Sequence, residues 1–428
     1  MNNDKKLLIR TWKIRSLLYF MGNTLRLAKT YKEAMLLITA FTIMVFINYI
    51  LFMVHIWSKN SLLFAIEKSF IISAVIIVLY LLYLVLLGMP KGARKTMRDF
   101  TRIGLVNHAY ETPLLFQEYE HQSSFTLVFR NVGIPVSRWI ELKENIESVL
   151  NINIIDIENQ GQKWIFINAV SGDIIIPKII KWEDKYLTSQ NNFKLVLGEG
   201  YQGKVTVDLS KNPHILIGGS TGSGKSILGK NLIYQCLKKK AEVIIADFKG
   251  GVDFSKKWHA KCTFITEQEP LIQKLNEIVF ELHNRKAMFA DLDCANIDEY
   301  NQKYNRHLQR IVFFCDEVAE IIDKTGLNKE QKQKISEIEA NLATIARLGR
   351  AFGIHLILST QRPDANILSG QIKNNIDIRV CGRADDVLSQ IILDKTDASD
   401  LIPKDAQGRF LTNNDVLFQA YWFDDTNI

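Results

Sequence analysis

The residues with the clearest chemical meaning form the sequence GSTGSGKS at positions 219–226. Glycine lets a backbone approach a ligand closely, and successive N–H groups ahead of a helix form a concave site for anions. Lysine and a hydroxyl residue at the end of such a turn suit phosphate oxygens and a divalent cation, so the pattern G-x-x-x-x-G-K-[ST] predicts binding of nucleotide phosphates. The predicted phosphate-binding residues are Gly219, Ser220, Thr221, Gly222, Ser223, Gly224, Lys225 and Ser226.

Two adjacent carboxylates supply a second chemical signal. Asp316 and Glu317 follow the apolar run IVFFC at 311–315. In nucleotide hydrolases with such a phosphate loop, an Asp at this place holds the metal, so we expect Ser226 and Asp316 to ligate Mg²⁺. A neighbouring Glu is placed to polarise the attacking water, which separates a hydrolase from a nucleotide binder. We therefore predict that Lys225, Asp316 and Glu317 are catalytic.

These side chains can act together only if strands and helices bring them to one edge of a sheet. The apolar run 214–219 leads into the glycine-rich loop, and the segment 227–239 has the pattern of a helix after it. Further apolar runs at 244–249, 311–317 and 355–364 alternate with helical segments from about residue 191 onward. This alternation predicts a parallel, doubly wound α/β sheet.

Other polar residues fall at the ends of the same predicted strands. Asp247 and Lys249 end one run, and Gln361 and Arg362 end another. Ligands of parallel sheets bind at the carboxyl ends of the strands. Gln361 is therefore a candidate catalytic sensor of the γ-phosphate, with a loop-capping role as the alternative.

Four arginines near this region are candidates for a residue that acts in a neighbouring subunit. A ring-forming ATPase inserts one arginine into the phosphates of the next subunit, whereas most arginines of this kind lie on a surface or at a sheet edge. The sequence does not distinguish among Arg347, Arg350, Arg379 and Arg383.

Two apolar segments near the N-terminus have the length of membrane spans. Residues 34–57 and 69–90 carry no formal charge, and about 20 apolar residues cross a bilayer as a helix. A signal peptide does not explain the pair, because the basic lead-in is long and a second apolar segment follows at once. Two buried helices of a soluble protein remain the alternative. The flanks 1–33 and 91–102 are rich in Lys and Arg, so the positive-inside rule places both termini in the cytoplasm and 58–68 outside.

Composition excludes several classes of protein. The 428-residue chain is 47% hydrophobic and 23% charged, so it is not a disordered chain. Its five cysteines are odd in number and form no C-x-x-C pair, which argues against a disulfide framework or a zinc finger and favours a reducing compartment. The formal charge of +7 lies in the basic flanks, while residues 103–428 are slightly acidic, so net charge is no evidence for DNA binding.

A small module separates the apolar segments from the predicted sheet. Residues 125–130 alternate as a half-buried strand does, 137–150 have a helical period, and 151–159 and 163–170 are strand-like. The order predicts a β-α-β-β unit. It holds no catalytic cluster, so we expect it to serve packing or oligomer contacts.

Several segments together resemble one known family. VTVDLSKNPHILIGGSTGSGKS (205–226), IADFKG (245–250), FFCDEVAEI (313–321) and IARLGRAFGIHLILSTQRPD (345–364) are similar, in order and spacing, to blocks of the FtsK/SpoIIIE family of DNA-pumping ATPases. The segment 134–170 resembles the module that precedes the motor of that family. The resemblance implies a RecA-like P-loop ATPase, ATP and Mg²⁺ as ligands, a hexameric ring around DNA and ATP-driven translocation.

The expected α/β fold is therefore a RecA-like P-loop ATPase with a small α+β module and an N-terminal two-helix transmembrane hairpin. The predicted parts are a basic cytoplasmic segment (1–33), a first transmembrane helix (34–57), an external loop (58–68), a second transmembrane helix (69–90), a basic juxtamembrane segment with the small module (91–190) and the ATPase motor (191–428). Chromosome-segregating members add a winged-helix module and a larger membrane domain, and we expect neither here.

The layout with two spans and no long linker is similar to coupling proteins of conjugative plasmids and integrative elements of Gram-positive bacteria. Such proteins lie at the inner face of the cell membrane and feed a relaxase-bound single strand to channel proteins. The leading hypothesis is thus a homo-hexameric conjugation coupling ATPase. The alternatives are a double-stranded chromosomal DNA pump, an ATPase of protein secretion, and a nucleotide-binding scaffold without turnover, which the pair Asp316 and Glu317 argues against.

Overall fold

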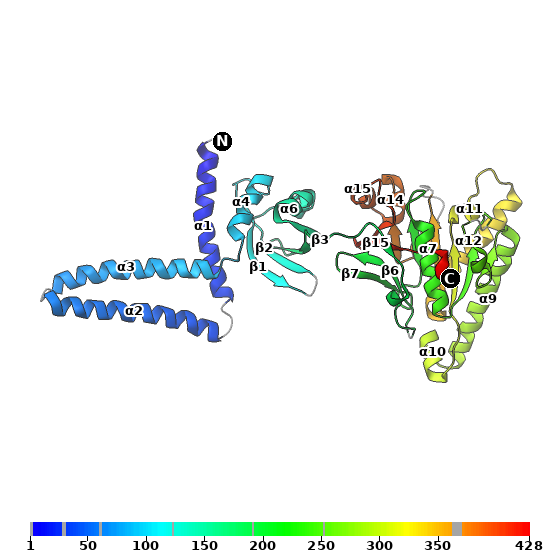
Figure 1. Cartoon of the computed structure of the whole chain (residues 1–428), viewed down its shortest axis with the longest axis horizontal. Coiled ribbons are helices and arrows are strands. Elements are labelled where there is room, and N and C mark those ends of the chain that lie inside the picture. Colours follow the sequence, from blue (N-terminus) through cyan, green and yellow to red (C-terminus); the bar gives the residue numbers. More distant parts are fainter. Residues whose placement is uncertain are drawn as a thin grey trace. The chain divides into compact units, whose positions relative to one another are not determined.

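The computed structural model describes residues 3–27, 31–59, 62–121, 124–190, 192–250, 253–361 and 370–428 (Figure 1). Its contacts divide the chain into two compact units, Met1–Ile174 and Ile175–Ile428, here called the N-terminal and C-terminal units. Residues 175–190 belong to the C-terminal unit. The finer domain limits drawn from the sequence stay predictions.

Parallel strands form the centre of the C-terminal unit, in the order β10-β9-β11-β12-β8-β13. Every residue of β11 and β12 is buried, as is typical of parallel strands covered on both faces. The predicted parallel α/β sheet is thus confirmed. The bounds are β8 Ile215–Gly218, β9 Glu242–Ala246, β10 Thr263–Ile265, β11 Ile311–Cys315, β12 Ile354–Thr360 and β13 Ile378–Cys381.

Helices cover both faces of this sheet (Figure 1). On one face, α7 and α8 pack over side chains such as Ile217, Val243 and Phe314. On the other face, α9, α11, α12 and α14 pack over side chains such as Ile244 and Phe313. The bounds are α7 Lys225–Lys238, α8 Lys256–His259, α9 Gln268–Asp291, α10 Ile297–Tyr304, α11 Val318–Ile322, α12 Lys329–Phe352, α13 Gly370–Lys373, α14 Asp386–Leu393 and α15 Asp397–Leu401.

The sheet continues beyond β13 as antiparallel strands in the order β14-β15-β6-β7, with β5 paired to β15. The sequence did not predict this part, because it depends on pairing between the C-terminal strand β15 and strands of residues 180–208. Pairing between segments so far apart in the chain leaves no local signal. The bounds are β5 Ile180–Lys181, η1 Asp184–Tyr186, β6 Lys194–Gly200, β7 Gly203–Asp208, β14 Arg409–Thr412, β15 Leu417–Trp422 and η2 Asp425–Asn427.

The N-terminal unit contains a four-stranded antiparallel sheet in the order β1-β2-β4-β3. The last three strands match the predicted β-α-β-β order, but β1 was not predicted, and the expected single helix is divided at Leu142 into α5 and α6. Phe100, Phe129 and Trp139 pack as buried rings in its core. The bounds are α4 Ala93–Ile103, β1 Leu114–Glu120, β2 Phe125–Arg130, α5 Val136–Glu141, α6 Lys143–Leu150, β3 Ile152–Gln160 and β4 Trp164–Ser171.

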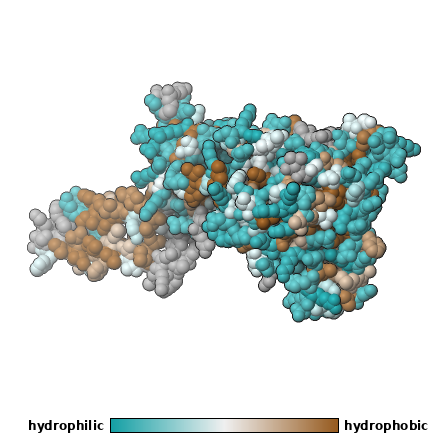
Figure 2. Space-filling view, turned by 45° about the vertical axis from the view of Figure 1, so that its right-hand side comes forward, coloured by the Kyte–Doolittle hydropathy of each residue, from teal (hydrophilic) through white to brown (hydrophobic). Residues whose placement is uncertain are grey.

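Three long helices precede this module: α1 (Asn3–Leu27), α2 (Tyr31–Lys59) and α3 (Leu62–Leu87). Leu36–Val54 and Ile66–Leu87 are long and apolar enough to cross a membrane, and only 6% and 11% of their most apolar windows are buried. The helices α2 and α3 form an exposed hydrophobic hairpin (Figure 2), unlike the core helices of a soluble protein. Asn48 donates a hydrogen bond of 2.6 Å to Ser73 across the hairpin, a polar contact of the kind that joins membrane helices.

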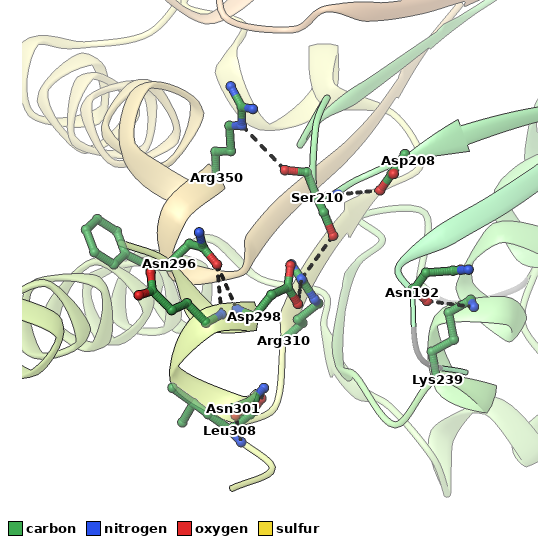
Figure 3. A network of polar contacts seen from close by, with 12 residues as sticks. Asn192, Asp208, Ser210, Lys239, Asn296, Asp298, Asn301, Leu308, Arg310 and Arg350 are labelled. Atoms are coloured by element: carbon green, nitrogen blue, oxygen red, sulfur yellow. Dashed lines mark hydrogen bonds and ion pairs between the residues drawn. The ribbon is translucent and has the colours of Figure 1, made fainter. Parts of the chain in front are cut away.

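A polar network ties the amino ends of the parallel strands (Figure 3). Arg310 donates hydrogen bonds to Asp298 (2.6 Å) and to the hydroxyl of Ser210 (3.1 Å). It also donates to Nε2 of His355 (3.1 Å), whose Nδ1–H donates to the carbonyl of Pro213 (3.0 Å). The imidazole is therefore neutral, and burial together with Arg310 holds the pKa of His355 well below its usual value.

His214 is a second buried imidazole in this region. Its Nδ1 accepts the N–H of Leu356 at 2.9 Å, and its Nε2–H donates to the carbonyl of Ala346 at 3.1 Å. Burial lowers the pKa of His214 from 6.5 to about 4. The neutral ring thus joins the start of β8 to β12 and α12.

This geometry predicts that stability falls in mild acid. The unfolded chain binds a proton at His214 near pH 6.5, whereas the folded chain does so only near pH 4, so the folded state loses stability as pH falls through this window. For one histidine, the free energy of unfolding changes with pH by up to about 1.4 kcal/mol per pH unit in this window. The free energy of unfolding of the full chain in detergent, measured with denaturant at several pH values, should fall less steeply for His214→Gln than for wild type.

The exposed His307 offers a matched control in the same unit. His307→Gln should keep the wild-type slope. An unchanged slope in His214→Gln would contradict the role of its burial.

Candidate active site

A cavity of about 400 Å³ opens at the carboxyl ends of β8, β11 and β12. It contains most of the residues predicted from the sequence, brought together from segments about 140 residues apart. Gly219, Ser220 and Ser223 belong to the same loop without lining the cavity. The predicted residues that line it are Thr221, Gly222, Gly224, Lys225, Ser226, Asp316, Glu317 and Gln361.

The loop needs glycine at its turning points. Gly219, Gly222 and Gly224 have φ of 146°, 74° and 103°, values that side chains disfavour. A Cβ on Gly219 would lie 2.6 Å from Oγ of Ser223. Since α7 begins at Lys225, the N–H groups at its start face the loop and form a site for anions.

The ammonium of Lys225 lies inside this loop. Nζ donates to the carbonyl of Gly219 at 2.5 Å and to that of Ser220 at 3.1 Å, and the residue is only 8% exposed. Burial lowers the pKa of Lys225, and the carboxylates of Glu317 and Asp316 counteract this. A phosphate oxygen held by the loop would contact this cation directly.

Ser226 and Asp316 offer the oxygens that Mg²⁺ prefers. The hydroxyl of Ser226 donates to Oδ1 of Asp316 at 3.1 Å, and Nζ of Lys249 lies 3.5 Å from Oδ2. Among the described residues, no group of three His, Cys, Asp or Glu side chains could hold a metal. Because hydroxyl and carboxylate oxygens are ligands of Mg²⁺, the pair fits an ion that takes its other ligands from water and nucleotide phosphates.

Glu317 is held firmly at the edge of the cavity. Its Oε1 accepts the hydroxyl of Thr360 (2.8 Å) and the N–H of Ala319 (3.3 Å), while Oε2 accepts the N–H of Gln361 (3.0 Å). The side-chain oxygen of Gln361 accepts the hydroxyl of Thr221 at 2.9 Å. A chain of hydrogen bonds thus joins the glycine-rich loop to the carboxylate through Gln361.

Asp247 lies behind this group, 2% exposed, at the end of β9. Its Oδ1 accepts the N–H of Lys249 at 2.9 Å, and its Oδ2 has no partner among the described residues. Burial raises the pKa of Asp247, with the nearby Asp316 adding to the effect. It does not line the cavity, whereas Lys249 does.

Arg383 supports the glycine-rich loop from within the same chain. Its guanidinium donates to the carbonyls of Thr221 and Lys404, both at 2.7 Å, and its own carbonyl accepts the N–H of Ser220 at 2.7 Å. No local sequence signal indicates this contact, because Ser220 and Arg383 lie 163 residues apart.

The other candidate arginines lie elsewhere. Arg379 pairs with Asp394 at 2.5 Å, and Arg350 donates to the carbonyl of Ser210 at 3.4 Å. Arg347 is exposed on α12. Arg362 lies outside the described residues.

The far wall of the cavity was missed by sequence reasoning. It comes from the segment before β5, from the turn that precedes β14 and from β15, with Tyr421 and Trp422 as its aromatic members. These residues show no motif, and only the antiparallel part of the sheet brings them opposite the loop. The residues of this wall are Lys178, Ile179, Gln407, Gly408, Gln419, Ala420, Tyr421 and Trp422.

Comparison with known proteins gives consistent matches. Residues 179–343 match the FtsK/SpoIIIE family. The DNA translocase FtsK of Caldanaerobacter subterraneus is 29% identical over 339 residues, which cover 75% of this chain and 45% of that protein. The DNA translocase SpoIIIE of Bacillus subtilis is 27% identical over 357 residues, which cover 77% of this chain and 42% of that protein. The chain therefore spans less than half the length of these relatives.

A solved structure of a conjugation protein also matches this chain. It is the monomer form of the pCW3 conjugation coupling protein TcpA with ATPγS, which is 37% identical with a TM-score of 0.59. The match covers 79% of this chain and 97% of that chain. The likeness thus extends well beyond the glycine-rich loop.

The contacts of Arg383 predict a loss of nucleotide affinity when they are removed. Arg383→Ala should raise the Kd for ATPγS about tenfold, because the loop loses charge-assisted bonds that hold its shape. Fluorescence anisotropy of a labelled analogue, at protein concentrations that keep the chain monomeric, measures this. Arg306→Ala is the control and should leave the Kd unchanged, because Arg306 is exposed and does not line the cavity. Unchanged affinity in Arg383→Ala would instead favour a role in a neighbouring subunit.

Proposed function

Because the chain belongs to the FtsK/SpoIIIE family, we propose that it is a membrane-anchored, ATP-driven DNA translocase that acts as a coupling protein in conjugative DNA transfer. The observation that carries the proposal is the 37% identity to the pCW3 conjugation coupling protein over 97% of that chain. The proposed cargo is single-stranded DNA with its relaxase attached, and the proposed partners are the proteins of the transfer channel.

The chain is a P-loop ATPase, and its site suggests how each residue contributes. We assign the binding of the β- and γ-phosphates to the loop N–H groups and Lys225. Ser226 and Asp316 would hold Mg²⁺, which supplies charge neutralisation at the phosphates. Glu317 would orient the attacking water and accept its proton, since Thr360 and the N–H of Gln361 fix its carboxylate at the cavity.

Gln361 suits the role of a γ-phosphate sensor in this proposal. It contacts Thr221 in the loop through its side chain and Glu317 through its backbone. A change at the phosphates that moved Thr221 would therefore shift both Glu317 and the end of β12. Such a link would connect the state of the nucleotide to the segment that follows Gln361.

The hairpin α2–α3 is proposed to span the cell membrane. Its apolar surface is exposed, and Lys and Arg are concentrated in the flanks 1–33 and 91–102. The positive-inside rule then places both termini, and with them the ATPase, in the cytoplasm. The exposed Trp57 lies near the end of α2, where aromatic side chains favour the interface.

A ring of six chains, the family's typical assembly, is also part of the proposal. In such a ring one arginine reaches the phosphates of the next subunit. Arg350, Arg379 and Arg383 are engaged within the chain. Arg347 is exposed and forms no ion pair with any described residue, so it is the proposed residue for this contact.

Two further functions use the same ATPase. The relatives named DNA translocases FtsK and SpoIIIE favour a pump for double-stranded DNA as the second candidate. An ATPase of protein secretion is the third candidate, and no described feature of the site indicates whether the cargo is protein or DNA.

The hydrolysis of ATP by the full chain in lipid nanodiscs, alone and with DNA, tests the proposal. We expect single-stranded DNA to stimulate the rate about tenfold over the basal rate, because a translocase couples turnover to its track. Lys225→Ala should abolish turnover, since the cation at the phosphates is lost. The stimulation should weaken as salt rises, because phosphate contacts release counterions.

The outcomes separate the candidates. Stronger stimulation by duplex DNA than by single-stranded DNA would contradict the role in conjugative transfer and favour the double-stranded chromosomal DNA pump. No response to either DNA in the assembled ring would overturn DNA translocation and favour protein cargo. Turnover that survives in Lys225→Ala would contradict the assigned site itself.

A further inference from the structure

A second cavity, of about 630 Å³, lies in the N-terminal unit between α1 and α4. We call it the α1–α4 groove. Its volume falls within the range of roughly 300–1,000 Å³ that is usual for small-molecule sites. None of the predicted site residues lines it, so neither ATP binding nor hydrolysis accounts for it.

The floor of the groove is apolar and well anchored. Trp12 and Phe20 of α1 are 4% and 0% exposed, and Nε1–H of Trp12 donates to Oγ1 of Thr112 at 3.2 Å. Met97 of α4 and Met89, just after α3, continue the floor. Leu17, at the wall, is 38% exposed. Such a surface suits an apolar chain.

The rim of the groove is basic. Lys13, Arg94, Arg98 and Arg102 line it, and the last two have side chains 63% and 68% exposed. One acidic side chain near this rim is Asp99, which is 7% exposed and lies 3.8 Å from Arg98 and 3.3 Å from Arg102, while Glu111 pairs with Arg15. Among the described residues, no carboxylate forms an ion pair with Lys13 or Arg94. The rim therefore keeps an excess of positive charge.

The groove adjoins the end of the apolar hairpin. Met89 lies two residues beyond the end of α3 at Leu87, and Asn23 of α1 donates to the carbonyl of Gly88 at 2.9 Å. The helix α1 runs across the end of the hairpin (Figure 1) and exposes Ile14 and Leu18 at 61% and 64%. If the hairpin spans the membrane, as proposed above, α1 lies at the level of the lipid headgroups on the cytoplasmic side.

We propose that the α1–α4 groove binds one anionic phospholipid of the cytoplasmic leaflet. One acyl chain lies on the floor formed by Trp12, Phe20 and Met97. The phosphate is bound by Lys13 and Arg94, with Arg98 and Arg102 beside it. An apolar floor under a basic rim at the membrane surface matches this amphiphile, whereas an apolar helix of another protein would leave the cations of the rim without partners.

The test uses the full chain in nanodiscs whose lipid is phosphatidylcholine with increasing amounts of phosphatidylglycerol. Brominated acyl chains quench nearby tryptophan, and the contribution of Trp12 is the difference between wild type and Trp12→Phe. We expect half-maximal quenching of Trp12 at a low mole fraction of brominated phosphatidylglycerol. The double variant Lys13→Gln/Arg94→Gln should need an about tenfold higher mole fraction of this lipid for half-maximal quenching, because it removes two cations and leaves the floor intact.

Lys95→Gln is the matched control, since Lys95 is an exposed cation of α4 that does not line the groove. It should behave as wild type. Equal quenching by brominated phosphatidylcholine, or an equal effect of Lys95→Gln, would overturn a specific site and leave only general attraction to the surface. A chain that does not enter nanodiscs would instead refute the membrane placement on which the site rests. DNA-stimulated ATP hydrolysis is measured separately, so loss of the lipid site can be distinguished from loss of the proposed function.

Discussion

The carboxylate of Glu317 is fixed by the neighbouring strand, and the working parts of the active site depend on this contact. The register that pairs Phe314 with Ile357 and Cys315 with Leu358 brings the ends of β11 and β12 to the same edge. The hydroxyl of Thr360 can then donate to one carboxylate oxygen of Glu317, and the N–H of Gln361 can donate to the other. Asp316, the residue before Glu317, is directed to Ser226 by the same backbone. Strand pairing thus sets the position of Glu317 together with that of Asp316, the residues proposed to act on water and metal.

The order of the strands determines the distance between the glycine-rich loop and the carboxylates. Because β12 lies between β8 and β11, two strand spacings of about 4.8 Å each separate the glycine-rich loop from the carboxylates. In the proposed mechanism that gap would hold the phosphate groups and the attacking water, with Gln361 just after the end of the intervening strand β12. The antiparallel strand β15, with the turn that precedes β14, closes the cavity on the far side and adds Tyr421 and Trp422. In the proposed mechanism, hydrolysis and nucleotide enclosure would therefore be supplied by different halves of one sheet.

Sequence reasoning succeeds here where the chemistry is local. The loop 219–226 and the pair Asp316 and Glu317 each consist of a few adjacent residues with a recognisable pattern, and the structure brings the pair and most of the loop to one cavity. Thr360 gave no signal, since a buried threonine at a strand end is common. The contact of Arg383 with the loop, the wall made by β15 and the packing of Trp12 on Thr112 all join distant segments, which a single sequence does not reveal.

The most direct test of this account is the rate of a single turnover of ATP hydrolysis at saturating ATP, with wild type and Glu317→Gln compared. The amide keeps the size and the acceptor oxygen of the side chain but cannot take a proton from water. Glu317→Gln is expected to bind ATP within about twofold of wild type and to hydrolyse it at least about a hundredfold more slowly. A rate within about threefold of wild type would contradict the role of Glu317 as the base.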